Sequence, residues 1–302
     1  MANTVSYANV KTFEDNVRFL AQQKGSKFRP YVQTRNTKAE SHSWSRVGTI
    51  EAITKVGRAV DSPIQDTPFS ARVATPTTKN GGDLVEPEDI VQMLIDPTSS
   101  ISTELGYALG RAYDDLVIAA ATGKAIDSTG ESNAFPTAQI VNSANAGSIT
   151  AAGGALTTEY VAVIQEQFWT NNIDPDEPKV IFVGPGQMQN LIQIEKATSD
   201  RYVNSKVLAE TGVVHNWMGF TWRLSTRLTQ ATAGSTICLA MTEKAMGFMM
   251  DKDIWVECKQ RPDKSFAWQV YGAFTGGAVR VEDEHIVAAV FLNAAAAGTA
   301  GF

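Results

Sequence analysis

The side chains that most often carry chemistry in proteins are scarce in this sequence of 302 residues. Its three histidines, His42, His215 and His285, stand in unrelated contexts, and none belongs to the His-Glu-x-x-His pattern that binds zinc. Its two cysteines, Cys238 and Cys258, form no Cys-x-x-Cys pair, and neither has neighbours that would activate a thiol. We therefore expect no structural zinc, no disulfide framework and no cysteine nucleophile.

Two glycine-containing segments match phosphate-binding loops only in part. In residues 122–125 the sequence TGKA has Ile118 where the loop glycine would stand, and it lacks the Ser or Thr that would follow the lysine. The segment around Gly184 and Gly186 lacks the third glycine of a dinucleotide loop. We expect Gly123 to end a helix, and the second segment to be a turn that begins one.

Acidic residues gather at three places, and none has the pattern of a catalytic pair. Residues 174–178 contain three carboxylates and two prolines, which departs from a calcium-binding loop. Asp114 and Asp115 are adjacent on a predicted helix, so we expect them to be solvated or paired with Arg111. The run at 282–284 predicts a solvated turn. The sequence assigns no catalytic residue, cofactor or metal ligand, which favours a structural or binding role.

The charge of the chain is divided unevenly along the sequence. Overall there are 26 Lys and Arg against 32 Asp and Glu, a net charge of -6. Residues 1–82 hold 12 basic and 6 acidic residues, a net of +6, which leaves 14 basic and 26 acidic residues, a net of -12, for the other 220. Such asymmetry indicates that the first part seeks an acidic partner, either nucleic acid or another copy of the chain.

The first 82 residues contain too few large apolar side chains to build a core. Residues 1–44 predict an N-terminal arm, and residues 45–82 an extended hairpin loop whose two halves flank the turn-rich stretch DSPIQD. In TPFSARVAT, Phe69 and Arg72 fall on opposite faces of a strand with period-two alternation. A long two-stranded ribbon of this kind is marginally stable alone, so we expect it to lie on another surface.

A long helix is the strongest local signal. Asp96 can cap it, Pro97 suits its first position and Gly123 its end. About 26 residues at 1.5 Å each make a rod of roughly 40 Å. The predicted buried stripe steps by three and four residues along the helix and consists of Ile101, Leu105, Ala108, Ala112, Leu116 and Ala119.

The remaining segments predict an α+β fold. Residues 124–156 are rich in small and polar residues and predict a surface excursion. A second helix follows within residues 157–172, then a buried strand at 179–183 that leads into a third helix. Strand-like runs continue from residue 219 to residue 292, separated by turn signals.

This order of elements resembles the major capsid proteins of tailed bacteriophages. The segment IVQMLIDPTSSISTELGYALGRAYDDLVIAAATGKA looks like the family's spine helix and its approach. KVIFVGPGQMQNLI is similar to the axial strand and helix, and VLAETGVVHNWMGFTWRLSTRL to the family's pattern of Gly, aromatic-Gly-Phe and strand. The likeness covers roughly residues 40–293 and rests on element order and diffuse patterns.

The resemblance implies a specific division of the chain. It would comprise an N-terminal arm (1–44), an extended β-hairpin loop (45–82), a peripheral domain with a long spine helix and β-ribbon (83–153), an inserted axial domain (154–272), and peripheral return strands with a C-terminal tail (273–302). We expect five residues of the arm and loop to contact neighbouring subunits: Trp44, Arg46, Arg58, Phe69 and Arg72.

The resemblance also implies a function without catalysis and without cofactors. It implies a shell protein that assembles as hexamers and pentamers into an icosahedral head around double-stranded DNA. Implied partners are further copies of the chain, portal and scaffolding proteins, and a decoration protein, with only nonspecific proximity to the packaged double-stranded DNA. No cleavable scaffold segment is visible, so a separate scaffolding protein is implied, or none. The implied location is the virion, assembled in the host cytoplasm.

Two alternatives stay open at this point. A cellular nanocompartment shell shares the fold but encloses a cargo enzyme, and the sequence hardly separates it from a viral head. A soluble α+β enzyme of unknown reaction is the alternative from another class. A membrane protein is not indicated, since no window approaches the ~20 consecutive apolar residues of a membrane span.

Overall fold

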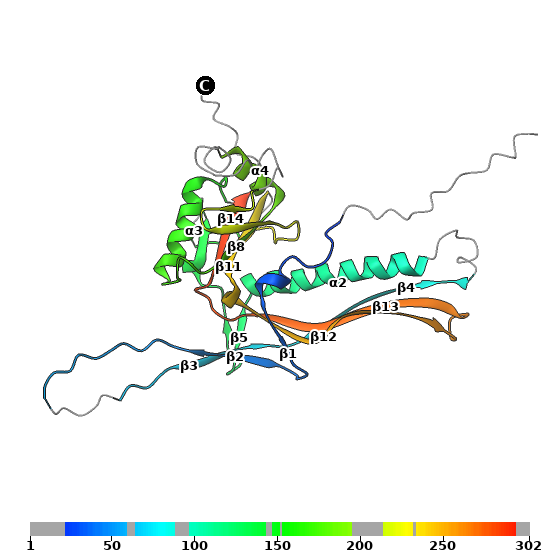
Figure 1. The fold of residues 1–302 in the computed structure, drawn as a ribbon, viewed down its shortest axis with the longest axis horizontal. Helices are drawn as coiled ribbons and strands as arrows, with labels where there is room; N and C mark the ends of the chain where they lie inside the picture. Colours follow the sequence, from blue (N-terminus) through cyan, green and yellow to red (C-terminus); the bar gives the residue numbers. More distant parts are fainter. Residues whose placement is uncertain are drawn as a thin grey trace, which may run out of the picture.

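The computed structural model describes residues 22–58, 64–87, 97–142, 147–151, 153–194, 214–231 and 234–293. The predicted α+β fold is confirmed (Figure 1). The helices are α2 (Pro97–Thr122), α3 (Thr158–Thr170) and α4 (Pro185–Gln193), with short 3-10 turns η2 (Arg29–Tyr31), η3 (Thr137–Gln139) and η4 (Glu243–Ala245). The strands are β1 (Gln33–Asn36), β2 (His42–Val47), β3 (Phe69–Ala74), β4 (Thr77–Val85), β5 (Ala125–Asp127), β6 (Ser132–Asn133), β7 (Ile140–Asn142), β8 (Lys179–Val183), β9 (Asn216–Trp217), β10 (Phe220–Leu224), β11 (Ser235–Thr242), β12 (Met246–Arg261), β13 (Ala267–Arg280) and β14 (Ile286–Leu292).

One half of the molecule consists of α2 laid along a long, narrow sheet. The 26-residue helix begins at Pro97 and ends before Gly123, as the sequence predicts, although the expected cap, Asp96, lies outside the described residues. The sheet has the order β1-β12-β13-β4, and its central pair, β12 and β13, runs the length of the helix (Figure 1). Residues 246–272 therefore lie with the helix and not with α3, whereas the predicted axial domain includes them. The division into domains as such stays a prediction.

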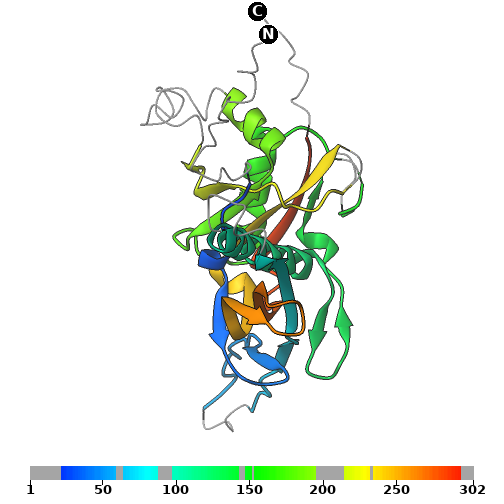
Figure 2. The same ribbon diagram turned by 90° about the vertical axis from the view of Figure 1, so that its right-hand side faces the viewer.

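The other half is built on a six-stranded sheet of order β7-β14-β11-β8-β10-β9. In Figure 2, which looks along α2, this half lies above the helix and the long sheet lies below it. The helices α3 and α4 cover one face of the six-stranded sheet, and the end of α2 packs against the other. The segment at 124–156, expected to be a plain surface excursion, contributes β5, β6 and β7, of which β7 pairs with β14.

The central strands have apolar side chains on both faces because each face has its own core. Along β8, Val180 and Phe182 belong to the core shared with α2, whereas Ile181 and Val183 belong to the core beneath α3 and α4. Successive side chains of a strand point to opposite faces, so a strand covered on both sides must be apolar throughout. This explains the uninterrupted run KVIFV and confirms the predicted buried strand.

The buried face of α2 differs from the predicted stripe. Leu105, Ala112 and Leu116 lie half-buried at its border, and Ala119 is exposed. The fully covered positions are Leu109, Gly110, Tyr113, Asp114, Val117, Ile118 and Ala121. The prediction followed apolar residues alone, but the helix buries a glycine and an aspartate against the N-terminal segment, which turns the covered face by about one residue.

Asp114 holds the N-terminal segment onto α2. Its carboxylate is fully buried and accepts hydrogen bonds from the side chains of Gln23 and Ser26 and from the backbone N–H groups of Lys27 and Phe28. The expectation that Asp114 is solvated or paired with Arg111 is therefore wrong. A buried carboxylate is tolerated where several donors satisfy it, and hydrogen bonds to a charged group contribute about 1.5–3 kcal/mol each.

Gly110 allows this close approach. A Cβ atom at position 110 would lie 2.8 Å from the Cα of Gly25, whereas a Cβ atom at Gly106, one turn earlier, would meet nothing within 4 Å. The two glycines therefore differ in their surroundings, because the backbone of Gly25 lies against Gly110 and no described atom lies close to Gly106.

We predict opposite effects of alanine at these two glycines. Gly106→Ala should stabilise the subunit by about 0.5–1 kcal/mol, because glycine is unfavourable inside a helix. Gly110→Ala should destabilise it by about 1–3 kcal/mol through the clash with the N-terminal segment. Urea unfolding of the unassembled subunits measures both, and a stabilised Gly110→Ala variant would contradict the described packing.

Candidate assembly interface

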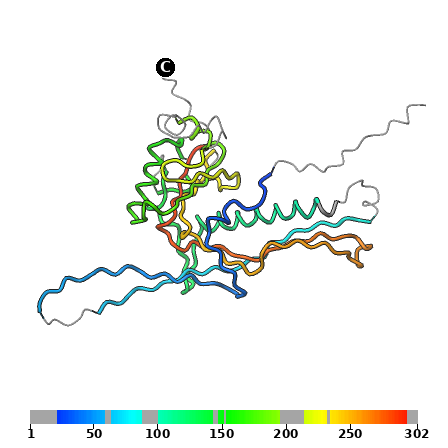
Figure 3. Tube along the Cα trace, viewed as in Figure 1, coloured from blue at the N-terminus to red at the C-terminus, as the bar shows by residue number. Residues whose placement is uncertain are grey.

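An extended loop projects from the body on the side opposite to the far end of α2 (Figures 1 and 3). Its base is the antiparallel pair β2 and β3, in register from His42 opposite Ala74 to Val47 opposite Phe69. The Gly48 N–H donates to the Pro68 carbonyl at 2.8 Å, and beyond this point the described arms, residues 48–58 and 64–68, form no strand ladder. The expected long ribbon is thus paired only at its base, because Gly48 and Pro68 interrupt the ladder.

The loop arms expose an unusual amount of apolar surface. Val56 and Ile64 are 94% and 98% exposed, and the Phe69 side chain at the base is 73% exposed. The other large apolar side chains exposed on the loop are Val47, Ile50 and Ile53. Since β-branched and aromatic side chains gain free energy when they leave water, such a concentration on a projecting segment is typical of a contact surface.

Trp44 fixes the base of the loop to the body. Its indole is buried in a small core that includes Met249 and Val279. Gly247 lies directly beneath the ring, where a Cβ atom would come within 2.6 Å of the indole. Nearby, the Arg46 guanidinium donates to the Val281 carbonyl at 2.9 Å.

A buried charge cluster completes this attachment. Asp283 bridges two guanidinium groups, with Arg72 at 3.0 Å on one oxygen and Arg280 on the other. Arg280 is completely buried and Arg72 is 5% exposed. Burial lowers the pKa of Arg72, and the nearby Asp283 carboxylate opposes that shift. The two arginines come from β3 of the loop and β13 of the body, so one carboxylate joins the two.

Arg280 also contacts two further segments. It donates to the carbonyls of Ala121 and Gly123 at the end of α2, at 3.2 and 2.7 Å, and to those of Asn133, the last residue of β6, and Ala134. Helix ends leave carbonyl groups unsatisfied, and here a cation satisfies two of them. The end of α2, the β5–β6 hairpin and the loop base therefore converge on a single side chain.

The five residues expected to contact neighbouring subunits thus fall into two groups. Phe69 and Arg58 are exposed. Trp44 and Arg72 are buried within their own chain, and Arg46 is half-buried against Val281. Sequence reasoning missed Arg280 and Asp283, and it interpreted residues 282–284 as a solvated turn. Their spacing of three residues with opposite charge was the available signal.

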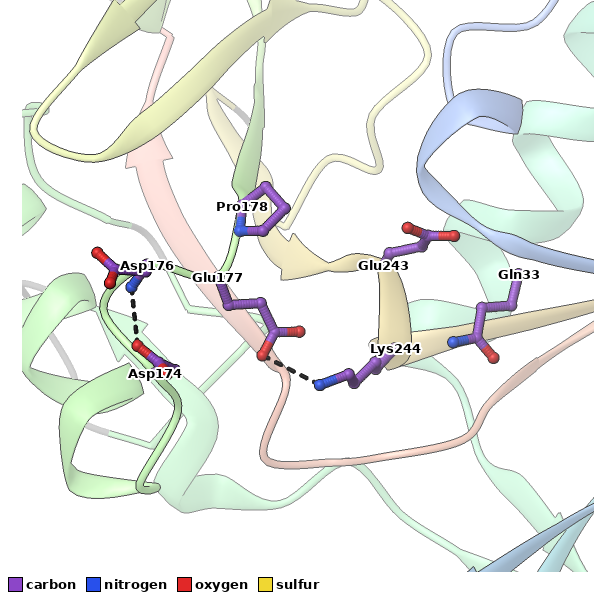
Figure 4. Close-up of a pocket in the computed structure, with 7 residues that line it drawn as sticks. All are labelled: Gln33, Asp174, Asp176, Glu177, Pro178, Glu243 and Lys244. Atoms are coloured by element: carbon purple, nitrogen blue, oxygen red, sulfur yellow. Dashed lines mark hydrogen bonds and ion pairs between the residues drawn. The ribbon is translucent and has the colours of Figure 1, made fainter.

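A buried lysine holds the backbone of the acidic turn before β8. The buried Lys179 ammonium donates to the carbonyls of Asp174, Pro175 and Glu177 at 2.9, 3.1 and 3.2 Å, and burial lowers its pKa. The charges of Glu177, Asp174 and Asp176 oppose this lowering of the Lys179 pKa. The turn borders an open pocket of about 550 Å³, shown in Figure 4, lined by Gln33, Asp174, Asp176, Glu177, Pro178, Glu243 and Lys244.

Two of the other residues that the sequence singles out, Cys238 and His285, are held by their surroundings, whereas Cys258 is exposed. Cys238 is buried, which raises the pKa of its thiol to about 12 and leaves it protonated at neutral pH. His285 lies between Thr242 and Glu282, with 2.8 Å between its Nδ1 and the threonine Oγ1. Across the described ranges, no three His, Cys, Asp or Glu residues are grouped so as to hold a metal ion, and no helix is long and apolar enough to cross a membrane.

The molecule thus combines a long helix on a ribbon, a sheet covered on both faces and a projecting loop. A sequence model of the phage capsid protein family matches residues 5–292. The chain belongs to the phage capsid protein family. It is a structural protein of the capsid shell. No curated protein matches the chain.

Solved phage capsids share the fold of this family member at low sequence identity. The capsid structure of cyanophage P-SCSP1u is 17% identical with a TM-score of 0.76, over 97% of this chain and 96% of that chain. The capsid of cyanophage Pam1 is 13% identical with a TM-score of 0.71, over 97% and 100%. The capsid of Ralstonia phage GP4 is 12% identical with a TM-score of 0.68, over 99% and 100%.

We predict that Asp283→Asn destabilises the unassembled capsid subunit by about 3 kcal/mol, because it leaves two buried guanidinium groups without a counter-charge. Glu284→Gln removes the same charge from an exposed neighbouring position and should change stability by less than about 0.5 kcal/mol. Urea unfolding measures both. Equal effects of the two substitutions would show that the cluster does not hold the loop.

Proposed function

We propose that this capsid protein assembles as hexamers and pentamers into an icosahedral head that encloses double-stranded DNA. Membership of the phage capsid protein family supports a shell, and one structural observation carries the proposed mode of assembly. The loop projects from the body and exposes apolar side chains that no part of the described chain covers. A neighbouring subunit would cover them.

The free energy available from this contact is substantial. Fully burying a Val, Ile or Phe side chain gains about 1.5–3 kcal/mol. Val56 and Ile64 are almost fully exposed in the single subunit and would gain most. Part of this gain offsets the entropy of ordering the arms, so each contact is of moderate strength and a closed ring of them is stable.

The loop suits a head-to-tail ring. Such a ring requires each subunit to present one surface to the next subunit and a different surface to the previous one. A loop on one side of the body meets this requirement, since it reaches only one neighbour. The loop, residues 45–82, holds 5 basic and 3 acidic residues, a net of +2, whereas residues 83–302 have a net of -12, so opposite charges add attraction between a loop and the body that receives it.

Phe69 and Arg58 are the predicted contact residues that remain available to a neighbour. Phe69 would bury its ring against the next subunit, and Arg58 would approach that subunit's acidic surface. Trp44, Arg46 and Arg72 would act indirectly, by fixing the direction in which the loop leaves the body. We therefore propose direct contact with a neighbouring subunit for two of the five residues, and not for all five.

We further propose that the protein functions without catalysis and without a cofactor, as part of the virion, after assembly in the host cytoplasm. Portal and scaffolding proteins, and a decoration protein on the outer surface, are the other partners proposed. A nanocompartment shell around a cargo enzyme is the alternative within this fold. Purified shells distinguish the two, since a viral head holds DNA and a nanocompartment holds a cargo protein.

We predict that shortening the loop separates folding from assembly. Replacing residues 49–67 by Asn-Gly, together with Pro68→Thr, should close a two-residue turn, because the backbones of residues 48 and 68 are already hydrogen-bonded and threonine supplies the N–H that Pro68 lacks. The base with Trp44 and Arg72 stays intact, so we expect a thermal midpoint within a few degrees of the unaltered subunit, but no shells by negative-stain microscopy.

A second variant tests the apolar side chains alone. Val56→Ser with Ile64→Ser keeps the length of the loop and should leave subunit stability unchanged, because both residues are over nine-tenths exposed. It should raise the subunit concentration needed for assembly. Normal shells from both variants would refute the proposed role of the arms, and a persistent monomer from the unaltered chain would refute the shell itself.

A further inference from the structure

A pocket of about 360 Å³ lies between the N-terminal segment and the edge of the six-stranded sheet. Residues 26–31 form one wall, and residues 215–224, including β10, form the other. Trp222, which is 1% exposed, contributes an apolar surface. Three side chains in its lining can carry positive charge, Lys27, His215 and Arg223, and none of the described residues that line it is acidic. We call this the cationic pocket.

Two of these cations are held in place by uncharged groups. The Lys27 ammonium donates to the Leu224 carbonyl at 2.9 Å, and Arg223 Nε donates to the Tyr31 hydroxyl at 2.7 Å. The Arg223 guanidinium also lies 5.7 Å from the centre of the Tyr31 ring. These contacts orient the cations without neutralising them, and they leave the two terminal nitrogens of Arg223 available.

The surrounding cations show the opposite arrangement. Arg29 pairs with Asp253 at 2.7 Å, and Arg227 pairs with Asp115, so each has its own carboxylate. Over the ranges that the structure covers, no ion pair involves Lys27 or Arg223. The cationic pocket is thus a local excess of positive charge, in contrast to the pocket of Figure 4, which is lined mainly by carboxylates.

The pattern fits a phosphate better than a carboxylate. Two further exposed basic residues, Lys24 and Arg35, flank residues 26–31 in the sequence, with Arg35 on β1. A row of cations suits a polyanion with regularly repeated charges, and duplex DNA carries one charge per ~1.7 Å of its axis. A guanidinium with free terminal nitrogens binds phosphate through two parallel hydrogen bonds. Contacts of this kind read no bases, as packaging an entire genome requires.

We propose that the cationic pocket binds the phosphate backbone of the packaged duplex DNA, with Lys27 and Arg223 as the contacting residues. The inference rests on the proposed function, in which the shell encloses DNA. It assigns the surface around η2 and β10 to the interior of the head. It also divides the basic residues 1–82 between two partners. The N-terminal segment contacts DNA at this pocket, and the loop contacts neighbouring subunits.

The test uses unassembled full-length subunits and a fluorescent duplex of about 30 base pairs, with anisotropy measured across a range of salt concentrations. Lys27→Gln with Arg223→Gln should weaken binding about tenfold or more near 0.1 M salt. It should also lower the slope of log affinity against log salt by about 2, one for each lost phosphate contact. The matched control, Lys55→Gln with Arg58→Gln, removes the same two charges from the loop and should bind like the unaltered chain.

Two further measurements keep the outcome decisive. Lys27→Arg should retain binding, and poly-glutamate of equal charge should compete far less well than unlabelled DNA. Equal affinities for the pocket and loop variants, or equal competition by poly-glutamate, would overturn the proposal. Shell formation is scored separately by microscopy. If the pocket variant binds DNA normally but forms no shells, the pocket is a subunit contact, whereas failure of the unaltered chain to form shells refutes the proposed function instead.

Discussion

The geometry of this capsid protein depends on one buried cation, Arg280. A guanidinium without solvent needs a counter-charge and partners for its donors, and losing either is costly. Here the counter-charge is Asp283, shared with Arg72, and the carbonyl partners lie at the end of α2 and beside β6. These requirements can be met only if helix, hairpin, ribbon and loop base meet at one point. The direction of the loop follows from that constraint.

A buried anion on α2, Asp114, plays the corresponding part for the N-terminal segment. Asp114 collects hydrogen bonds from residues 23–28 and thereby lays the N-terminal segment across α2. Phe28 then stacks on Phe182 of β8, with 3.8 Å between the ring centres. Lys27 and Tyr31 reach the edge of the six-stranded sheet as a consequence. One helix therefore positions both charged features that concern function, the loop base at its end and the cationic pocket near its middle.

The sequence predicts the elements of this fold better than it predicts their contacts. The bounds of α2, the run KVIFV and the position of α3 follow from capping residues and periodicity, which are local signals. The buried face of α2 was misplaced because Asp114 and Gly110 lie on it, and composition treats both as surface residues. The pairing of Arg72 with Asp283 joins residues 211 positions apart, and no local pattern encodes it. For the same reason the sequence does not reveal that Trp44 and Arg72, predicted to contact a neighbouring subunit, are buried against their own chain.

The unpaired loop arms have a consequence for the life of the subunit before it is incorporated. Extended segments rich in Val and Ile are the kind that aggregate through unspecific strand pairing. In these arms Glu51, Lys55 and Arg58 interrupt the apolar positions, and Gly48 and Gly57 weaken any regular strand. More hydrophobic arms would promote aggregation of free subunits, whereas more polar arms would bind a neighbouring subunit in the shell too weakly. The composition of the loop therefore affects how long a free subunit stays unaggregated before it is incorporated into a shell.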